Sequence, residues 1–330
     1  MIELNNICKT FRVARRGGGM KAAAKALVRR EYETIEALRD VSFTIRDGEM
    51  VGYIGPNGAG KSSSIKIMSG ILTPDSGTCL INGRTPWKQR KEHVREIGVV
   101  FGQRSQLWWD VPVIDSFELI RDIYTVEPNR YRKNLDTLVS MLSLETILKT
   151  PARQLSLGQR MRCEIAGSLL HDPKVLFLDE PTIGLDAVSK IAVRDFIKTL
   201  NQEKGATVIL TTHDMQDIEA LTERILLIGK GRILMDGALS ELRRQRCATR
   251  AITVSFSGTQ ALTDEKGGFP PGLTLKESLN GHAVLDADTQ RCTVSEAIAW
   301  LSARMEVTDF SVSQPSAEEL VVGLYHAFGV

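Results

Sequence analysis

A glycine-rich octapeptide that follows a short apolar run constrains the fold of this chain more than any other feature. Residues 51–54 are apolar and lead directly into Gly55-Pro56-Asn57-Gly58-Ala59-Gly60-Lys61-Ser62. The octapeptide fits the pattern G-x-x-x-x-G-K-[ST], and a helical pattern begins at Ser62, which is the context that this pattern requires. Glycine lets a backbone wrap closely round phosphate oxygens, and the N-terminus of the following helix adds its positive end. The sequence therefore predicts a nucleotide phosphate loop rather than an incidental glycine-rich turn.

Two side chains of this loop have specific expected roles. Lys61 should reach the β- and γ-phosphates of the nucleotide, and the hydroxyl of Ser62 should ligate Mg²⁺. The residues expected to contact the nucleotide here are Gly55, Pro56, Asn57, Gly58, Ala59, Gly60, Lys61, Ser62 and Ser63. The loop alone does not say which class of nucleotide hydrolase carries it.

The remainder of the first 245 residues alternates short apolar runs with helical patterns. Strands are predicted at 2–11, 41–45, 51–54, 99–101, 175–178, 208–211 and 225–228, and helices at 115–124, 130–149, 159–170 and 189–203. This alternation predicts an α/β domain with a largely parallel sheet. The pair Asp47-Gly48 follows the alternating run at 41–45 and predicts a hairpin turn. From about residue 246 the character changes, which predicts a small α+β domain over 246–330 with a strand at 252–256 and a helix at 295–305.

Composition narrows the class of protein. The chain has 330 residues, 42% of them apolar, and 42 Lys plus Arg against 40 Asp plus Glu leave a net charge of +2. That balance argues against nucleic acid as a bulk partner, and the chain has no apolar stretch long enough to cross a bilayer. Five scattered cysteines and an N-terminus without a signal-peptide pattern predict a soluble chain in the reducing cytosol.

A second acidic motif ends the apolar run at 175–178. Asp179 and Glu180 follow it directly, and an acid at the carboxyl end of a parallel strand faces the crevice where ligands bind. Asp179 is suited to hold Mg²⁺, and Glu180 is suited to polarise the attacking water. Adjacent side chains of a strand point to opposite faces, so the two carboxylates can divide these roles.

The residues on both sides of the acidic motif extend the pattern. Leu155-Ser156-Leu157-Gly158-Gln159 lies upstream, Gly184-Leu185-Asp186 and His213 lie downstream, and Gln103 follows the run at 99–101. This ordered set resembles the nucleotide-binding cassette of ABC transporters over roughly residues 2–240. The resemblance implies the fold class of an ABC-type P-loop NTPase: a mainly parallel sheet, an antiparallel β subdomain and a helical subdomain at about 104–170. It extends the first domain over 1–245.

The resemblance also implies how the site works. ATP and Mg²⁺ are the implied cofactors, and two copies would pair head to tail, so that Ser156, Gly158 and Gln159 of one face the γ-phosphate held by the other. His213 would contact the γ-phosphate, with Glu180 and Gln103 as its catalytic partners. The implied metal ligands are Ser62, Gln103 and Asp179, and further nucleotide contacts would come from Phe11, which would stack on adenine, and Asp186. Leu157 departs from the family signature, which usually carries glycine there.

Two neighbouring tryptophans, Trp108 and Trp109, stand where transport cassettes receive the coupling helix of a membrane subunit. Paired aromatics are typical interface anchors, and the alternative is that both fill the core of the helical subdomain. The implied partners are separately encoded membrane-spanning permease subunits, which would hold the chain peripherally on the inner face of the cell membrane. Export resembling that of bacterial drug or viologen-type exporters is the favoured direction, with import as the alternative.

Other function classes are less well supported. A soluble ABC ATPase that acts on ribosomes or DNA is the second hypothesis, but this chain has one cassette and no sustained heptad pattern. A switch GTPase is disfavoured because no NKxD motif follows. The stretch at about 12–33 carries seven basic and no acidic residues between Arg12 and Arg30, which suits either contact with anionic lipid headgroups or a solvated loop.

Overall fold

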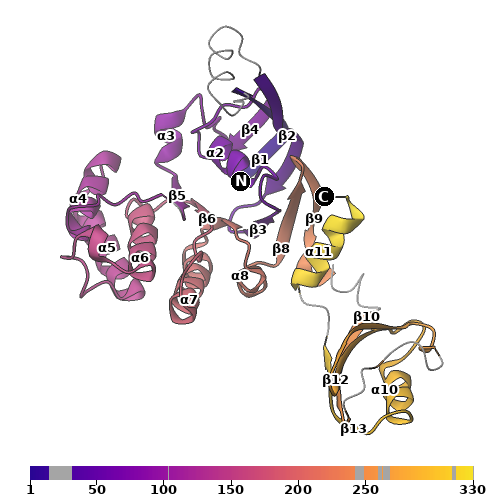
Figure 1. Ribbon diagram of the computed structural model, residues 1–330. Coiled ribbons are helices and arrows are strands. Elements are labelled where there is room, and N and C mark those ends of the chain that lie inside the picture. Colours follow the sequence, from indigo (N-terminus) through magenta and orange to yellow (C-terminus); the bar gives the residue numbers. More distant parts are fainter. Residues whose placement is uncertain are drawn as a thin grey trace, which may run out of the picture. The chain divides into compact units, whose positions relative to one another are not determined.

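The computed structural model describes residues 1–14, 32–102, 104–241, 249–258, 262, 268–313 and 317–329. The chain divides into two compact units, Met1–Asp236 and Gly237–Val330 (Figure 1). Among the helices of the described ranges, none has both the length and the apolar character that crossing a bilayer requires.

A three-stranded antiparallel sheet forms one part of the first unit. Its order is β2 (Tyr32–Ile45), β1 (Ile2–Ala14) and β4 (Ser76–Ile81). Alternate side chains of β1, such as Ile2 and Leu4, are buried in the main core. Arg12, Val13 and Ala14 pair with Thr34, Glu33 and Tyr32, so the two ends of the expected basic insert belong to the strands. Residues 15–31, the rest of that insert, lie outside the described residues.

The second sheet of this unit carries the acidic motif. Its strands, in spatial order, are β5 (Ile97–Phe101), β6 (Val175–Asp179), β7 (Thr207–Thr211), β3 (Met50–Ile54), β8 (Arg224–Gly229) and β9 (Arg232–Ala238). The first five are paired in parallel. Such strands are covered on both faces, and this explains why their apolar runs are continuous. The α/β prediction with a largely parallel sheet is confirmed.

The prediction of a hairpin at Asp47-Gly48 is wrong. The turn exists, with Gly48 at φ 75°, but it carries the chain from β2 in the antiparallel sheet to β3 in the other sheet. β3 is almost wholly buried between β7 and β8, and this burial favours the centre of the parallel sheet over an exposed pairing with β2.

Seven α-helices complete the described part of the first unit. They are α2 (Lys61–Met68), α3 (Arg90–Val94), α4 (Val113–Tyr124), α5 (Pro128–Leu142), α6 (Leu157–Leu169), α7 (Ala187–Lys204) and α8 (Met215–Leu221). Helices α4 and α5 both pack on α6 (Figure 1). The helix predicted to run to Lys149 ends at Leu142, because Ser143 takes a left-handed conformation there and closes the helix with its N–H.

The second unit is an antiparallel sheet with helices. The sheet order is β11 (Leu273–Leu279), β12 (His282–Asp288), β10 (Thr249–Phe256) and β13 (Val307–Ser313). Helix α10 (Val294–Ser302) buries Ala297 and Leu301 in a core that Ile252 and Leu285 share. Helix α11 (Ala317–Ala327) follows β13. The unit has the α+β character expected of this part of the chain.

Candidate nucleotide-binding and hydrolysis site

The phosphate loop takes its shape from close approaches that only glycine allows. A Cβ at Gly55 would lie 2.4 Å from the carbonyl oxygen of Ile228, and one at Gly60 would lie 2.7 Å from that of Ala37. Gly60 also has φ 113° and immediately precedes α2. The loop therefore packs closely against the C-terminal end of β8, and helix α2 starts at Lys61 with its N-terminus beside the loop.

Lys61 is folded back across its own loop. Its side chain is nearly buried, and Nζ donates to the carbonyl oxygens of Gly55 and Pro56, the latter at 3.1 Å. Burial lowers the pKa of Lys61, while the carboxylates of Glu180 and Asp179 oppose that shift. An ammonium held by two loop carbonyls at a glycine-rich helix start fits a phosphate group, which can replace those carbonyls as its partner.

Two oxygen atoms that could ligate a metal ion, the Ser62 hydroxyl and a carboxylate oxygen of Asp179, lie together next to the loop. The hydroxyl of Ser62 is 3.5 Å from Oδ2 of Asp179, and Thr211 Oγ1 donates to Oδ1 of the same carboxylate at 2.5 Å. The parallel register causes this arrangement, because Asp179 lies opposite Thr211 at the carboxyl ends of β6 and β7. Hydroxyl and carboxylate oxygens are the donors that Mg²⁺ prefers, and one or two from the protein suffice when phosphates supply the others.

The described residues hold no cluster of three or more His, Cys, Asp or Glu side chains that could bind a metal by itself. The hydroxyl of Ser62 and the carboxylate of Asp179 fit an ion whose other ligands come from a nucleotide. Gln103, the third expected ligand, lies outside the described residues.

The backbone changes direction between Asp179 and Glu180, so the two side chains do not continue one strand. β6 ends at Asp179, and Glu180 takes a left-handed conformation with φ 57° while its N–H donates to the carbonyl oxygen of Thr211 at 2.9 Å. The expected division of roles by strand alternation is thus wrong in its cause, since Glu180 is not in the strand. Non-glycine residues with positive φ are uncommon, and they occur often at active sites.

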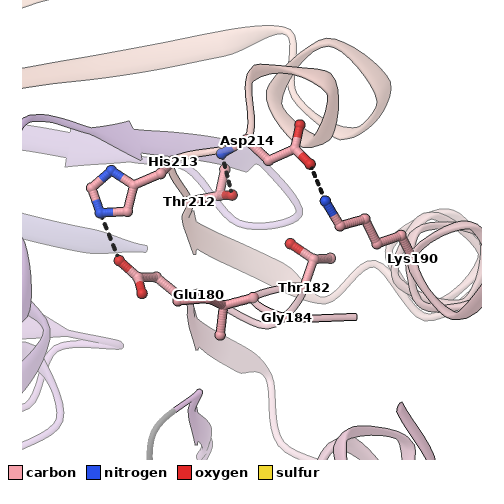
Figure 2. A pocket seen from close by; sticks show the side chains of 8 residues that line it. Glu180, Thr182, Gly184, Lys190, Thr212, His213 and Asp214 are labelled. Carbon is pink, nitrogen blue, oxygen red and sulfur yellow. Dashed lines mark hydrogen bonds and ion pairs between the residues drawn. The ribbon is translucent and has the colours of Figure 1, made fainter. Parts of the chain in front are cut away.

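Glu180 and His213 contact each other in the wall of a hollow of about 280 Å³. Nε2 of His213 is 2.8 Å from Oε1 of Glu180 (Figure 2). His213 follows β7 and Glu180 follows β6, which are neighbours in the sheet. Lys190 and Asp214 form an ion pair on the opposite side of the same hollow, with 2.6 Å between Nζ and Oδ2. The sequence-predicted pair of base and histidine is therefore brought within hydrogen-bond distance.

The signature residues begin helix α6. Ser156 is the N-cap, its hydroxyl accepts from the N–H of Gln159, and the Gln159 side chain accepts from the N–H of Ser156. Gly158 lies against α7, because a Cβ there would be 2.4 Å from Oγ of Ser189. Leu157, the departure from the family signature, packs against Gly184, where an added Cβ would be 2.8 Å from Leu157 Cδ2.

Asp186 lies beside the signature because it begins α7, the helix against which Gly158 packs. It is the N-cap of α7 and accepts from both the N–H and the hydroxyl of Ser189 at 2.9 Å. These two hydrogen bonds hold the pKa of Asp186 below its usual range. In the described part of the chain, none of the hydrogen bonds or ion pairs joins Ser156, Gly158 or Gln159 to the phosphate loop. The signature and Asp186 are held by contacts with α7 and with the segment that precedes it, whereas Lys61 is held by the phosphate loop.

Phe11 remains an untested expectation. It lies half-buried on β1, with Nζ of Lys9 5.8 Å from its ring centroid.

The two tryptophans are exposed and do not fill a core. Trp108 is 60% exposed and Trp109 is 51% exposed, in the segment between β5 and α4. Trp109 lines a groove of about 160 Å³ and lies 5.7 Å from the guanidinium of Arg160. The floor of this groove includes the nearly buried carboxylate of Glu164, whose pKa is raised by burial.

Sequence reasoning missed Glu164 and Asp217. Glu164 accepts hydrogen bonds from Ser105 Oγ and from the N–H of Gln106. The available signal was a lone acid within the apolar stretch of α6. Asp217 is fully buried in α8, and two of its partners, Thr182 and Arg194, lie 35 and 23 residues away in the sequence.

Comparison with known proteins identifies the family. A family model described as "ABC transporter" matches residues 38–183. The ABC transporter ATP-binding protein NatA of Bacillus subtilis is 31% identical over 210 residues, which are 64% of this chain and 85% of NatA. This chain belongs to the ABC transporter family. It is an ATP-binding subunit of the family and an ATPase, as the order of its motifs predicted.

Other members of the family match across more of the chain. The doxorubicin resistance ATP-binding protein DrrA of Mycobacterium tuberculosis is 30% identical over 302 residues, 88% of each chain. A dimeric structure of the ATP-binding cassette MJ0796 in a post-hydrolysis state, bound to ADP and Pi, superposes with a TM-score of 0.60 at 28% identity. That structure covers 72% of this chain and 98% of the cassette. ATP-binding proteins named for import match at similar identity.

Proposed function

We propose that two copies of this chain bind two ATP molecules head to tail and hydrolyse them to drive export through separate membrane-spanning permease subunits. The observation that carries the proposal is that the signature is held against α7, and that Lys61 is held by the carbonyls of its own loop. Lys61, Asp179, Glu180 and His213 lie at one edge of the sheet, whereas the signature begins a helix elsewhere. A second copy can bring its own signature to the nucleotide that the first copy holds, and the relative MJ0796 forms a dimer.

In this proposal each group does a defined task. Lys61 leaves the carbonyls of Gly55 and Pro56 and binds the β- and γ-phosphates. Ser62 and Asp179, with Gln103, hold Mg²⁺, which neutralises phosphate charge when bound. The N–H groups at the start of α6 and the Ser156 hydroxyl bind the γ-phosphate that the other copy holds.

Glu180 accepts a proton from the attacking water in this scheme. His213 lies 2.8 Å from Oε1 of Glu180, so an Nε2–H can hold the carboxylate in place, and the scheme assigns the contact with the γ-phosphate to the same side chain. Because the carboxylate projects from a left-handed turn, it stands off the strand end and leaves Asp179 free for the metal ion. The base and the metal ligand thus act without sharing one site.

The exposed tryptophans support a membrane subunit as partner. Aromatic side chains that are more than half exposed beside a groove provide an anchor surface, and Trp108 and Trp109 are 60% and 51% exposed. This surface suits docking to a protein such as a permease. The net charge of +2 provides no bulk attraction to nucleic acid, which disfavours ribosomes or DNA as the partner. The proposed location is the cytoplasmic face of the cell membrane. Export follows DrrA, whose name denotes drug resistance, and import is the alternative.

The second unit and the basic insert belong to the same proposal. We assign the C-terminal unit an accessory, regulatory role. The basic stretch at 12–33 is assigned to contact with anionic lipid headgroups. Co-sedimentation with anionic vesicles at two salt concentrations tests this contact, because deletion of residues 14–30 should weaken binding and reduce its salt dependence.

Glu180→Gln tests the hydrolysis scheme. Loss of a general base commonly slows turnover by about 10²–10⁴-fold, while ATP binding at Lys61 should remain. ATP should then trap a dimer that size-exclusion chromatography with light scattering detects. Glu203→Gln, on an exposed part of α7, is the matched control and should turn over as the wild type does. Normal turnover by Glu180→Gln together with a monomer in ATP would refute the scheme.

Direction of transport needs a separate measurement. Co-expression with the membrane proteins encoded beside this chain, followed by transport assays in inside-out vesicles, distinguishes the two directions. ATP-dependent accumulation of cargo inside such vesicles supports export, and ATP-dependent release of preloaded cargo supports import.

A further inference from the structure

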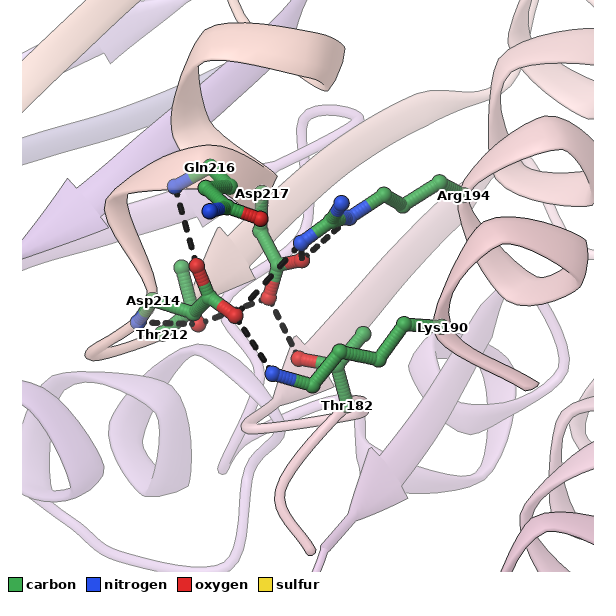
Figure 3. Close-up of polar contacts among 7 residues, drawn as sticks. All are labelled: Thr182, Lys190, Arg194, Thr212, Asp214, Gln216 and Asp217. Carbon is green, nitrogen blue, oxygen red and sulfur yellow. Dashed lines mark hydrogen bonds and ion pairs between the residues drawn. The ribbon is translucent and has the colours of Figure 1, made fainter. Parts of the chain in front are cut away.

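Asp217 is a fully buried carboxylate with donors on several sides. It lies in α8 at 0% exposure and accepts hydrogen bonds from Thr182 Oγ1, from Thr212 Oγ1 at 2.9 Å and from Nε of Arg194 at 2.5 Å (Figure 3). A buried charge is costly unless its geometry and pairing are good, and removal of one partner is then strongly destabilising. These contacts therefore hold three segments of the chain in one fixed arrangement.

Two of the three segments carry Glu180 and His213, and the third is helix α7. Thr182 lies two residues after Glu180, and Thr212 immediately precedes His213. Arg194 lies on α7, the helix that Asp186 caps. One buried carboxylate thus connects the loop after the proposed base, the loop of the histidine and the helix that begins at Asp186.

A second set of contacts fixes the other side of the histidine. The N–H of Asp214 donates to Thr212 Oγ1 at 3.0 Å, and its carboxylate pairs with Lys190 at 2.6 Å and with Arg194 at 3.5 Å. The backbone is therefore held immediately before and immediately after His213. The His213 side chain projects from this fixed loop toward Glu180 (Figure 2).

We propose that Asp217 and Arg194 are positioning residues for ATP hydrolysis, which set the geometry of the Glu180–His213 pair and connect it rigidly to α7. The inference rests on the roles proposed above for Glu180 and His213. The contacts of Asp217 and Arg194 lie away from the phosphate loop, so we expect them to affect the hydrolysis step through the Glu180–His213 pair and to leave nucleotide binding unchanged. A displacement of about 1 Å at a catalytic group can cost up to about 10²-fold in rate.

Asp217→Asn is the first test, because it keeps the side-chain size and removes the charge that Arg194 pairs with. We expect kcat for ATP to fall roughly tenfold, with the Kd of a fluorescent ATP analogue unchanged. In a His213→Ala background the same substitution should cost clearly less, since part of its effect passes through His213. Asp236→Asn is the control and should keep wild-type kcat. It removes a carboxylate paired with Arg224, which begins β8 at the end of that strand away from the phosphate loop.

Thr182→Val provides a milder test, which decides the matter if Asp217→Asn does not fold. It removes one hydroxyl donor to Asp217 and nearly conserves volume, and we expect a smaller fall in kcat that is again reduced in the His213→Ala background. Unchanged kcat, or an equal loss in both backgrounds, would overturn the positioning role. If His213→Ala itself turned over normally, the role proposed for His213 would fail and this inference with it.

Discussion

Replacement of Gly158 by alanine tests the contact between the signature helix and α7. An added Cβ would lie 2.4 Å from Oγ and 3.0 Å from Cβ of Ser189, and the first distance is too short to persist. Ser189 must rotate or α6 must move, and overpacking of this kind typically costs 1–3 kcal/mol. Alanine in place of glycine regains up to about 1 kcal/mol of helix propensity. The expected net loss in the free energy of unfolding is about 1 kcal/mol.

Thermal and urea unfolding of matched variants measure this loss. A loss of about 1 kcal/mol should lower the melting temperature of a domain of this size by about 2–4 °C. Ser189→Ala removes the atom at 2.4 Å and keeps the Cβ at 3.0 Å, so Gly158→Ala should cost clearly less in that background. Gly167→Ala, in the same helix, is the control, because its nearest contact would be the movable end of Ile120 at 3.1 Å, and Cε1 of Phe117 at 3.6 Å is in ordinary van der Waals contact.

The outcome also bears on function. If Ser189 rotates, it loses the hydrogen bond from its hydroxyl to Asp186, and the cap of α7 loosens beside the signature. Equal costs of Gly158→Ala with and without Ser189→Ala would show that this contact does not limit the packing. A gain in stability on Gly158→Ala alone would refute the reasoning in the same way.

Three further predictions concern the site, the docking surface and pH. Lys61→Ala should abolish ATP hydrolysis and weaken nucleotide binding, measured by phosphate release and analogue titration, because the phosphates lose the loop ammonium; wild-type turnover would contradict the site assignment. Trp108→Ala with Trp109→Ala should spare ATP binding and uncouple hydrolysis from transport, since exposed anchors can cost about 2 kcal/mol each; an unfolded protein or undiminished transport would count against it. Burial lowers the pKa of His171 to about 4, so the unfolded chain binds the extra proton first, and the free energy of unfolding should fall by up to about 3 kcal/mol from pH 6.5 to pH 4. His171→Gln should flatten that pH dependence in denaturant titrations, and an unchanged slope would refute this cause.

The buried surroundings of His171 explain why it stays neutral. Its ring stacks on Tyr124 with centroids 3.9 Å apart, and Nε2 bonds the carbonyl oxygen of Ile97 at 2.9 Å. The charges of Arg130 and Asp172 act in opposite directions on its pKa, and burial is the largest cause of the shift. Glutamine can keep the donor to Ile97 without titrating, so the comparison isolates protonation.

The sequence by itself determined the parts of the site that are encoded in contiguous residues. The phosphate loop is one such part, because glycines, lysine and serine in fixed order dictate a backbone that wraps round an anion between a strand and a helix. Asp179 and Glu180 at the end of an apolar run are another. Continuous apolar runs indicated parallel strands because burial on both faces leaves no place for alternating polar residues.

Tertiary structure decided whatever depends on which surfaces pack together. The turn at Asp47-Gly48 is locally compatible with a hairpin, and only the burial of β3 in the other sheet excludes one. The exposure of Trp108 and Trp109 likewise depends on what covers them. Burial and pairing are set by partners distant in sequence, and local patterns do not encode them.

The network at Asp217 shows the same limit most clearly. Its donors come from Thr182, Arg194 and Thr212, on three different segments, and no spacing rule links these positions to a buried acid. Glu180 is a related case, since its left-handed conformation follows from hydrogen bonds to the neighbouring β7. The sequence thus determined which residues can do the chemistry, and the packing of sheet and helices decided how they are held, because one buried carboxylate can be paired only where three segments converge.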